Sequence, residues 1–339
     1  MPRPEPRGEA MRRREFIKLL GGTATAWPLA AHAQQHEQMR RVAVLLGGLE
    51  FGDASGQVEI AAFEERLKEL GWTRGQNIDL DYHWPGAQTD RVHAVAGQIV
   101  ATHPDLVLSR STPATAALMS ASLPIVFVLV ADPMGSGFVQ NLGHPGFNLT
   151  GFSTFEPSAG GKWLALLREA APKVSRIALL FNPETAPFAE GYLHSARAAA
   201  QTLGVTAISV PCGNDDDIQA AFTALTREGS GGIIGIADTF IADHCDLIIA
   251  LAAQHRLPAI YGNPIFARSG GLMVYSPDYA AIYRRAASYV DRILRGTRPA
   301  ELPVQEPDKF TLSVNLNAAR AIGLNLPQTL VARADEVIE

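Results

Sequence analysis

Small, polar and acidic side chains follow the predicted strands of this chain, and their chemistry suits a small charged molecule. Ser111 and Thr112 stand between a predicted strand and a helix expected to begin near Pro113. Their hydroxyls and the unpaired amides of a first helical turn suit a carboxylate. Asp132 follows an all-apolar strand, and its carboxylate suits an ammonium group. A plain helix cap at Ser111 and a turn at Asp132 are the alternatives.

A second group of candidates follows strands predicted later in the chain. Asn182 and Asp238 occupy equivalent strand ends, and Asn263 follows a further strand. Turn or cap roles are the simpler interpretation of each one alone. Phe51 and Tyr275 offer an apolar wall or a cation–π face, although burial in the core is the commoner fate of such a ring. The predicted ligand-binding residues are Phe51, Ser111, Thr112, Asp132, Asn182, Asp238, Asn263 and Tyr275.

The sequence contains no residue pattern typical of catalysis or metal binding. The glycine-containing segment 47–52 lacks the spacing of a phosphate loop or a dinucleotide fingerprint. His244 and Cys245 are adjacent, and one helix cannot direct both side chains to one ion. A Gly-x-Ser-x-Gly nucleophile motif is also absent from the sequence. We therefore expect a protein without metal or cofactor that is not an enzyme; an active site without a sequence signature is the alternative.

The candidate residues require elements that bring strand ends together. From residue 41 onward, short β-branched runs alternate with helices whose apolar residues recur every three or four positions, which predicts βαβ units on parallel sheets. Ligands of such sheets bind at the carboxyl ends of the strands. Two successive series predict an α/β fold of two doubly wound parallel-sheet lobes. The predicted strands are 42–46, 78–84, 106–109, 125–130, 177–181, 205–210, 232–236, 259–261, 272–274 and 310–314.

The first 33 residues have the pattern of an export signal. Arg12 to Lys18 contains consecutive arginines, and a mild apolar run and the triplet Ala31-His32-Ala33 follow it. The pattern predicts a twin-arginine signal cleaved after Ala33, and hence a periplasmic protein. The apolar run is interrupted by glycine and proline and is shorter than the roughly 20 residues that span a bilayer. Met11 is an alternative start to Met1, in which case residues 1–10 are not translated.

Charge and cysteine content narrow the function classes. The chain has a formal net charge of −5, and the predicted signal carries more basic than acidic residues. The mature chain therefore has no basic field for nucleic acid, and we expect no nucleic-acid partner. Cys212 and Cys245 are the only cysteines, too few for a disulfide framework. The sequence leaves open whether they pair or are two buried thiols.

Several segments, in order along the chain, resemble the tryptophan-type substrate-binding proteins of ABC importers. Together they cover essentially all of 41–339. The resemblance implies a type I periplasmic-binding-protein fold, in which two lobes joined by a three-crossover hinge enclose a small molecule. It places the first lobe at 41–132 plus 272–305 and the second at 133–271 plus 306–339. The segments are the leader from Arg12 to Ile17, 111–115, 124–133, 148–151, 161–164, 180–183, 287–294 and 330–339.

The same resemblance implies a function. It predicts an extracytoplasmic solute-binding protein of an ABC importer, which binds an amino acid or a related small molecule between its lobes. The protein would then deliver this ligand to an ABC permease in the inner membrane, and we expect a monomer. Segments 261–266 and 51–55 depart from the family pattern and are candidate specificity loops. An exported α/β enzyme and a ligand-sensing module for a membrane receptor are the alternatives.

Overall fold

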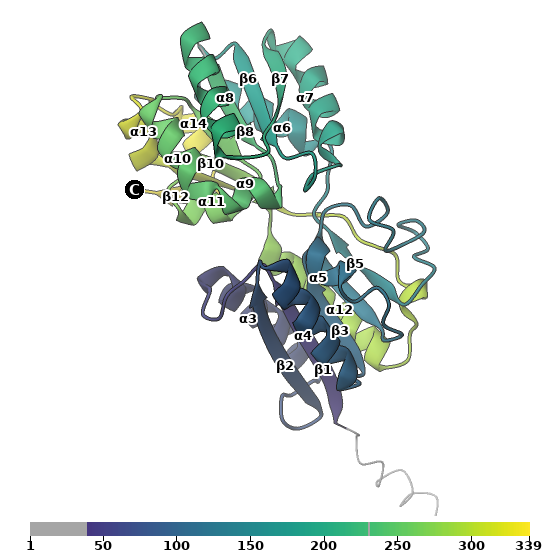
Figure 1. Ribbon diagram of the computed structural model, residues 1–339. Helices are drawn as coiled ribbons and strands as arrows, with labels where there is room; N and C mark the ends of the chain where they lie inside the picture. Colours follow the sequence, from purple (N-terminus) through teal and green to yellow (C-terminus); the bar gives the residue numbers. More distant parts are fainter. Residues whose placement is uncertain (1–38, 230) are drawn as a thin grey trace, which may run out of the picture.

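The computed structural model describes residues 39–229 and 231–339, which form two lobes (Figure 1). The predicted signal peptide and both candidate start residues lie outside the described residues. In Figure 1 the lower lobe contains the first strands of the chain and helix α12 (Tyr279–Leu294), and the C-terminus lies in the upper lobe. None of the helices in the described part of the chain is long and apolar enough to cross a membrane.

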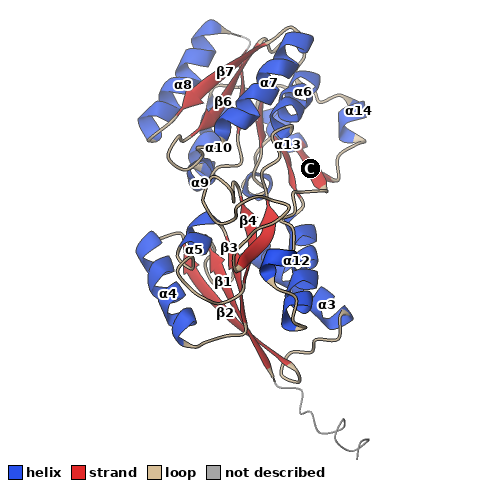
Figure 2. Ribbon diagram, turned by 90° about the vertical axis from the view of Figure 1, so that its right-hand side faces the viewer, coloured by secondary structure: helices blue, strands red, loops and turns tan. Residues whose placement is uncertain are grey.

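The first lobe is built on a five-stranded parallel sheet in the order β2-β1-β3-β4-β5. Helix α12 packs beside α3 (Ala54–Glu69) on one face, and α4 (Thr89–Ala101) and the short α5 (Thr112–Ala116) cover the other (Figure 2). Alternate side chains of each strand pack against the helices on one face of the sheet or the other, since successive strand residues point to opposite faces. The strands are β1 (Arg40–Gly47), β2 (Ile78–Gly86), β3 (Leu106–Arg110), β4 (Ile125–Val130) and β5 (Leu149–Ser153).

The second lobe has a seven-stranded sheet in the order β12-β11-β10-β9-β8-β6-β7, with β11 antiparallel to β10. One face packs against α6 (Ala159–Ala170), α7 (Ala189–Leu203), α13 (Leu316–Ala321) and α14 (Gln328–Val331). The other packs against α8 (Asp215–Glu228), α9 (Thr239–Asp243), α10 (Cys245–Gln254) and α11 (Ile265–Arg268). The two-lobed α/β fold class is thereby confirmed. The strands are β6 (Arg176–Phe181), β7 (Thr206–Pro211), β8 (Gly231–Gly235), β9 (Ala259–Tyr261), β10 (Met273–Pro277), β11 (Phe310–Asn315) and β12 (Glu336–Ile338).

Two strands pair in a different sheet from the one expected. β5 pairs with β4, so the segment up to residue 153 belongs to the first lobe. β10 pairs with β9 and β11, so residues 273–277 belong to the second. Strand partners in a parallel sheet are distant in sequence, and the local pattern does not identify them. The pairing places the first lobe at 40–153 plus 278–305, and the second at 154–277 plus 306–339.

Three crossovers join the lobes: β5 to α6, β10 to α12, and the 3-10 helix η1 (Pro299–Glu301) to β11. They lie side by side, because Ser153 N donates to Gln305 O at 2.8 Å and Asp278 N donates to Lys309 O at 3.0 Å. The Lys309 ammonium also pairs with the Asp278 carboxylate at 2.7 Å. The second and third crossovers are thus tied to each other by backbone and side chain.

These crossovers determine which edges of the two sheets face each other. β5 enters its crossover at its carboxyl end and runs parallel to its neighbour β4, so β1, β3 and β4 also end at that edge. β10 leaves the second sheet at its carboxyl end and is parallel to β9, β8 and β6, which end at the crossover edge too. We call these the two carboxyl edges. Figure 2 shows β4 pointing from its lobe toward the other one.

The two cysteines do not form a disulfide bond with each other. Cys212, just after β7, and Cys245, the first residue of α10, are both buried free thiols. Both side chains pack in the layer between the second sheet and helices α8 to α11. Burial, reinforced by nearby carboxylates, raises the pKa of Cys212 to about 12. The thiols therefore act as small apolar core residues.

Candidate functional site

The carboxyl edge of the first lobe contains two strained residues. Ser111, directly after β3, has φ 82° and ψ 157°, and Leu129, near the end of β4, has φ 56°. The neighbouring pairing of β4 with β5 shifts register between Val128 and Val130. Non-glycine residues in such conformations cost of the order of 1–3 kcal/mol and cluster at binding and catalytic sites. Strain at two adjacent strand ends marks this edge as a candidate binding site.

Ser111 lies where the end of β1 approaches α5 closely. A Cβ atom added to Gly47 would lie 2.7 Å from the Cβ of Ala114 and 2.9 Å from the Oγ of Ser111, so only glycine fits there. The hydroxyl of Ser111 makes no capping hydrogen bond to α5. Ser111 and Thr112 are both partly exposed. A polar ligand group at this edge would therefore meet a hydroxyl that α5 does not use.

Asp132, which follows β4, adopts the turn alternative in this structure. Its Oδ1 accepts a hydrogen bond from the amide of Gly135 at 2.8 Å. A Cβ at Gly135 would lie 2.1 Å from the other carboxylate oxygen, so the side chain folds back over its own turn. The residue remains partly exposed, at the same carboxyl edge as Ser111.

Asn182 and Asp238 meet at the carboxyl edge of the second lobe, because β6 and β8 are adjacent strands. The amide N of Asn182 donates to the Oδ2 of Asp238 at 2.8 Å, while Asp238 Oδ1 accepts from Phe240 N at 3.1 Å and Thr185 Oγ1 at 2.5 Å. Burial of the Asp238 carboxyl raises its pKa, and these hydrogen bonds act in the opposite direction. Both Asp238 oxygens thus serve internal bonds, and the side chain is only 2% exposed.

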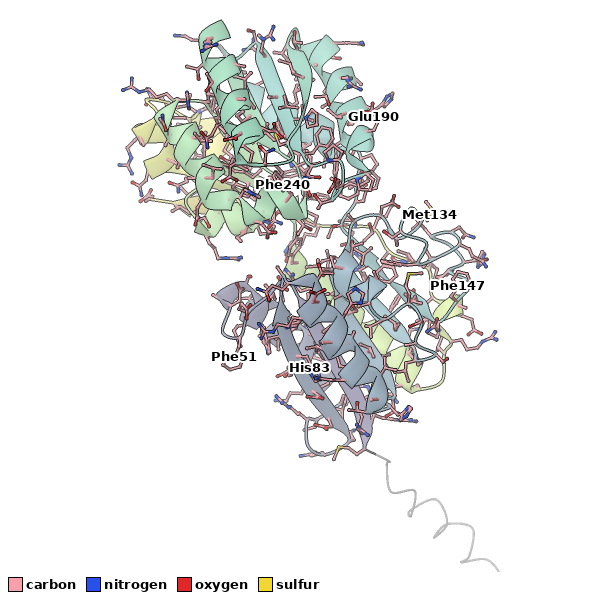
Figure 3. The ribbon with its side chains drawn as sticks, viewed as in Figure 1. Phe51, His83, Met134, Phe147, Glu190 and Phe240 are labelled. Carbon is pink, nitrogen blue, oxygen red and sulfur yellow. The ribbon has the colours of Figure 1, made fainter. Side chains whose placement is uncertain are left out.

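Of the other three predicted residues, Asn263 follows β9 at the same carboxyl edge as this pair, whereas no contact joins Tyr275 or Phe51 to it among the described interactions. Asn263 Oδ1 accepts from Ile265 N at 3.1 Å, which makes it a turn residue before α11. The ring of Tyr275 stacks on Phe310 with centroids 5.1 Å apart, and burial raises its pKa. Phe51 is 83% exposed and projects from the side of the lower lobe (Figure 3). The structure therefore brings Asn182 and Asp238 together but not the whole predicted set.

A buried ion pair at the first carboxyl edge was not predicted from the sequence. Arg110 Nε lies 3.2 Å from Glu59 Oε2, and their side chains are only 15% and 4% exposed. Burial lowers the pKa of Arg110, but the Glu59 charge outweighs it, so the guanidinium stays positive. The available signal was the position of Glu59 four residues before Phe63 on the apolar face of α3.

An aromatic cluster of the second lobe was also not predicted. Phe155 packs edge-on against Phe188 and Tyr192, with centroids 5.5 and 5.0 Å apart, and Trp163 lies 4.8 Å from Tyr192. Phe155 and Phe188 are partly exposed, whereas Trp163 and Tyr192 are buried. Phe155 lies in the first crossover and Phe188 directly precedes α7, so the cluster adjoins the second carboxyl edge.

One hollow lies at the carboxyl ends of β6 and β7. It measures about 330 Å³, and Asn182 is the only predicted residue in its lining. Its other lining residues are Pro183, Glu184, Pro211, Cys212, Gly213 and Asp217, all of the second lobe. Within 39–229 and 231–339, no three His, Cys, Asp or Glu side chains are grouped closely enough to hold a metal ion.

Electrostatic interactions connect the two lobes. Burial raises the pKa of Asp53, but hydrogen bonds from the first turn of α3 and the charge of Arg268 in the other lobe outweigh it. Burial also raises the pKa of Tyr279 to about 12, while the charges of Arg110 and Arg268 lower it. Burial is the main cause that raises the pKa of Tyr192 in the second lobe, and the nearby Tyr279 raises it further. Tyr279, just after the second crossover, therefore lies near charged groups of both lobes.

Comparisons with known proteins agree with this architecture. A family model described as ABC transporter substrate binding protein matches residues 53–338. A curated protein of Clostridioides difficile (strain R20291), named tyrosine-binding protein, is 23% identical over 267 residues, which are 77% of this chain and 75% of that protein.

Two solved structures are similar over nearly the whole described chain. An ABC domain from Streptococcus pneumonia in complex with L-Trp has a TM-score of 0.77 at 23% identity, covering 89% of this chain and 100% of that chain. A conserved domain protein from Vibrio cholerae has a TM-score of 0.76 at 28% identity, covering 88% of this chain and 100% of that chain. The first of these shows the similarity of fold, and the second adds a closer sequence relationship.

Proposed function

This chain belongs to the family of ABC transporter substrate-binding proteins, and from that premise we propose that it binds an amino acid or a related zwitterion between its lobes for delivery to an ABC permease. Proteins of this family work outside the cytoplasm. The observation that carries the proposal is that both carboxyl edges adjoin the same three crossovers. In open α/β sheets, loops at this edge form the ligand site.

The side chains at the two edges supply complementary chemistry. The free hydroxyl of Ser111 and the adjoining Thr112 suit the ligand's carboxylate, and the exposed part of Asp132 suits its ammonium group. Phe155 and Phe188 at the opposite edge offer an apolar face for a side chain. An aromatic amino acid suits such a face, in keeping with the name of the Clostridioides difficile relative and the L-Trp of the Streptococcus structure.

Binding would be coupled to closure of the lobes. A ligand that touches both carboxyl edges makes more contacts when the edges approach each other, and it therefore shifts the population toward the closed form. The free energy by which a ligand can favour the closed form is the difference between its binding free energies for the closed and open forms. Among the predicted residues, Asn182 is our candidate for the second-lobe contact through its amide group, since its Oδ1 already accepts from Glu184 N at 2.7 Å. Asp238 would act through the hydrogen bond that fixes the Asn182 backbone.

The test is a ligand screen on the purified mature chain. Each of the twenty L-amino acids, with tryptamine and tyramine as analogues that lack the carboxylate, is added at millimolar concentration while thermal unfolding is followed. We expect at least one amino acid to raise the Tm by mass action and to reduce the radius of gyration in X-ray scattering. A screen in which no compound moves either quantity would refute the proposed ligand class.

The leader supports export through the twin-arginine pathway to the periplasm. The Arg13→Lys, Arg14→Lys double variant should keep the protein in the cytoplasm, since the arginine pair is the receptor-read element. The measurement is fractionation with N-terminal sequencing, and the exported form should begin at Gln34. Export of the double variant at the unmodified level would contradict the assignment.

A further inference from the structure

The Glu59–Arg110 pair is a buried ion pair at a binding edge, and no contact proposed above uses it. Its 3.2 Å separation and low exposure take both charges out of water. Buried ion pairs usually give little net stability, because desolvation offsets the attraction between the charges. Stability alone is therefore a weak explanation for the pair.

The guanidinium is fixed in position by its surroundings. Nε faces Glu59 Oε2, and Nη1 donates to the carbonyl oxygen of Gly47 at 2.9 Å. Gly48 has φ 83°, and a Cβ there would lie 3.3 Å from the same Nη1, so the chain after β1 rests on the guanidinium. These two bonds engage Nε and Nη1, and the donors of Nη2 can serve another partner. A guanidinium held on one side presents its other donors in a fixed direction.

A buried hydroxyl also adjoins the pair. The hydroxyl of Tyr283 on α12 is fully buried. Glu59 acts on this hydroxyl through its charge and as a hydrogen-bond acceptor, so the two side chains are neighbours. Buried polar atoms are nearly always bonded, and Glu59 serves both Tyr283 and Arg110. The carboxylate is thereby held between α12 and β3, in a position that fixes the guanidinium.

The pair also lies at the strand end that adjoins the crossovers. Arg110 precedes the strained Ser111 and interacts electrostatically with Tyr279, the residue that follows the second crossover. Tyr279 is also within electrostatic range of Arg268 in the second lobe. Arg110 therefore lies at the carboxyl edge of the first lobe, near the second crossover.

We propose that Arg110 is a ligand-binding residue that pairs with the anionic group of the ligand, and that Glu59 is a positioning residue that holds its guanidinium. The inference rests on the proposed function and specifies it: the ligand carries a carboxylate or another planar anion. Arg110 complements the Ser111 hydroxyl, because charged and neutral donors together satisfy both oxygens of a carboxylate.

The test compares two ligands on two proteins. L-tryptophan and tryptamine differ only by the carboxylate, and their affinities are measured by calorimetry on the unmodified chain and on the double variant E59Q/R110Q. The double variant exchanges both charged groups for neutral amides, which avoids an unpaired buried charge. We expect L-tryptophan to bind the double variant about 10- to 100-fold more weakly, and tryptamine affinity to change less than about twofold.

Two further variants separate binding from folding. R110K keeps the charge but loses the planar fork, and we expect an intermediate loss of L-tryptophan affinity at unchanged Tm. R40Q removes the arginine of an exposed pair with Asp105 at the opposite end of the same sheet, and it should bind both ligands as the unmodified chain does.

The outcomes distinguish the inference from the proposed function. If the unmodified chain binds no amino acid, the function and the inference both fail. If it binds L-tryptophan, and E59Q/R110Q and R110K bind it as tightly as R40Q does, the inference alone is overturned. Equal losses for L-tryptophan and tryptamine in a folded variant would also overturn it, since they would show a structural role without recognition of the carboxylate.

Discussion

Ser111 has a backbone conformation that serine rarely adopts. Its φ of 82° with ψ of 157° lies in a region populated almost only by glycine. The conformation persists because Ser111 N donates to Val128 O at 3.0 Å and Ser111 O accepts from the amide and hydroxyl of Thr115. The strained serine thus places a hydroxyl at the carboxyl edge where glycine would be more stable.

Two substitutions at Ser111 should separate stability from binding. Ser111→Gly relieves the strain and should raise the free energy of unfolding by about 1 kcal/mol, while weakening ligand affinity through loss of the hydroxyl. Ser111→Ala should weaken affinity to a similar degree without the gain in stability. Urea denaturation and calorimetry measure the two effects. Unchanged affinity in both variants would show that the hydroxyl does not contact the ligand.

Helices α6 and α7 of the second lobe pack at a close backbone approach. A Cβ at Gly160 would lie 2.1 Å from the carbonyl oxygen of Tyr192, a distance that no real Cβ tolerates. The contact places Tyr192, and with it the aromatic cluster, beside the second carboxyl edge. The glycine is therefore required by helix packing, although alanine would favour the helix locally.

Alanine at two helical glycines should have opposite effects on stability. Gly160→Ala should lower the free energy of unfolding by about 1–3 kcal/mol, because α6 must shift away from α7. Gly97→Ala in α4 should raise it by about 0.5–1 kcal/mol, because no atom lies within 4 Å of the added Cβ. Urea denaturation of both variants measures the change in the free energy of unfolding. Effects of the same sign would contradict the packing argument.

The second and third crossovers are joined by a partly exposed ion pair. Asp278 caps α12 through the amide of Ala281 and pairs with Lys309 at 2.7 Å. Burial raises the pKa of Asp278, but the bonds from Lys309 and the helix amides outweigh it, so the pKa lies below its ordinary value of 3.8. Since the folded-state pKa is lowered, the carboxylate's stabilisation is complete above the unfolded pKa and is lost as pH falls through the folded one.

Asp278→Asn tests this pH dependence, since asparagine caps a helix about as well as aspartate. At pH 7 the variant should be less stable by under about 1 kcal/mol, as expected for a pair whose lysine is largely exposed. The difference should vanish below the native pKa of Asp278. Urea titrations at a series of pH values measure it, and a difference that persists in acid would point to a cause other than charge.

At the scale of the whole molecule, the lobes interact through charges before any ligand binds. Arg268, the exposed last residue of α11, interacts with Asp53 and Glu59 of the first lobe. Opposite charges on the two carboxyl edges favour their approach, and salt weakens this attraction. We therefore expect this charge pattern to assist the proposed closure over a ligand.

Reversal of the charge at Arg268 should hinder closure. Arg268→Glu should weaken ligand affinity a few-fold at low salt and less at high salt, and the ligand-bound radius of gyration should increase. Arg298→Glu, which alters an exposed pair with Glu301 in the first lobe, is the matched control. Calorimetry and X-ray scattering at two salt concentrations measure the ligand affinity and the radius of gyration of both variants. Equal behaviour of the two variants would exclude a role of Arg268 in closure.

Local patterns in the sequence were sufficient to predict the fold class and the sheet edges on which the candidate residues lie. Strands such as 125–130 follow from local patterns of apolar residues, which depend only on which side chains must be buried. Ser111, Asp132 and Asn182 follow strands, and the parallel arrangement places each of them at a carboxyl edge.

The choice of sheet for each strand, and the contacts between polar groups, became known only when the elements were packed together. The lobe membership of β5 and β10, the contact between Asn182 and Asp238, and the pairing of Glu59 with Arg110 all join residues far apart in the chain. Local sequence patterns indicate whether a side chain is buried, but they do not indicate which residue it contacts. The partner is fixed when strands and helices pack, because burial in the core demands a specific hydrogen bond or countercharge.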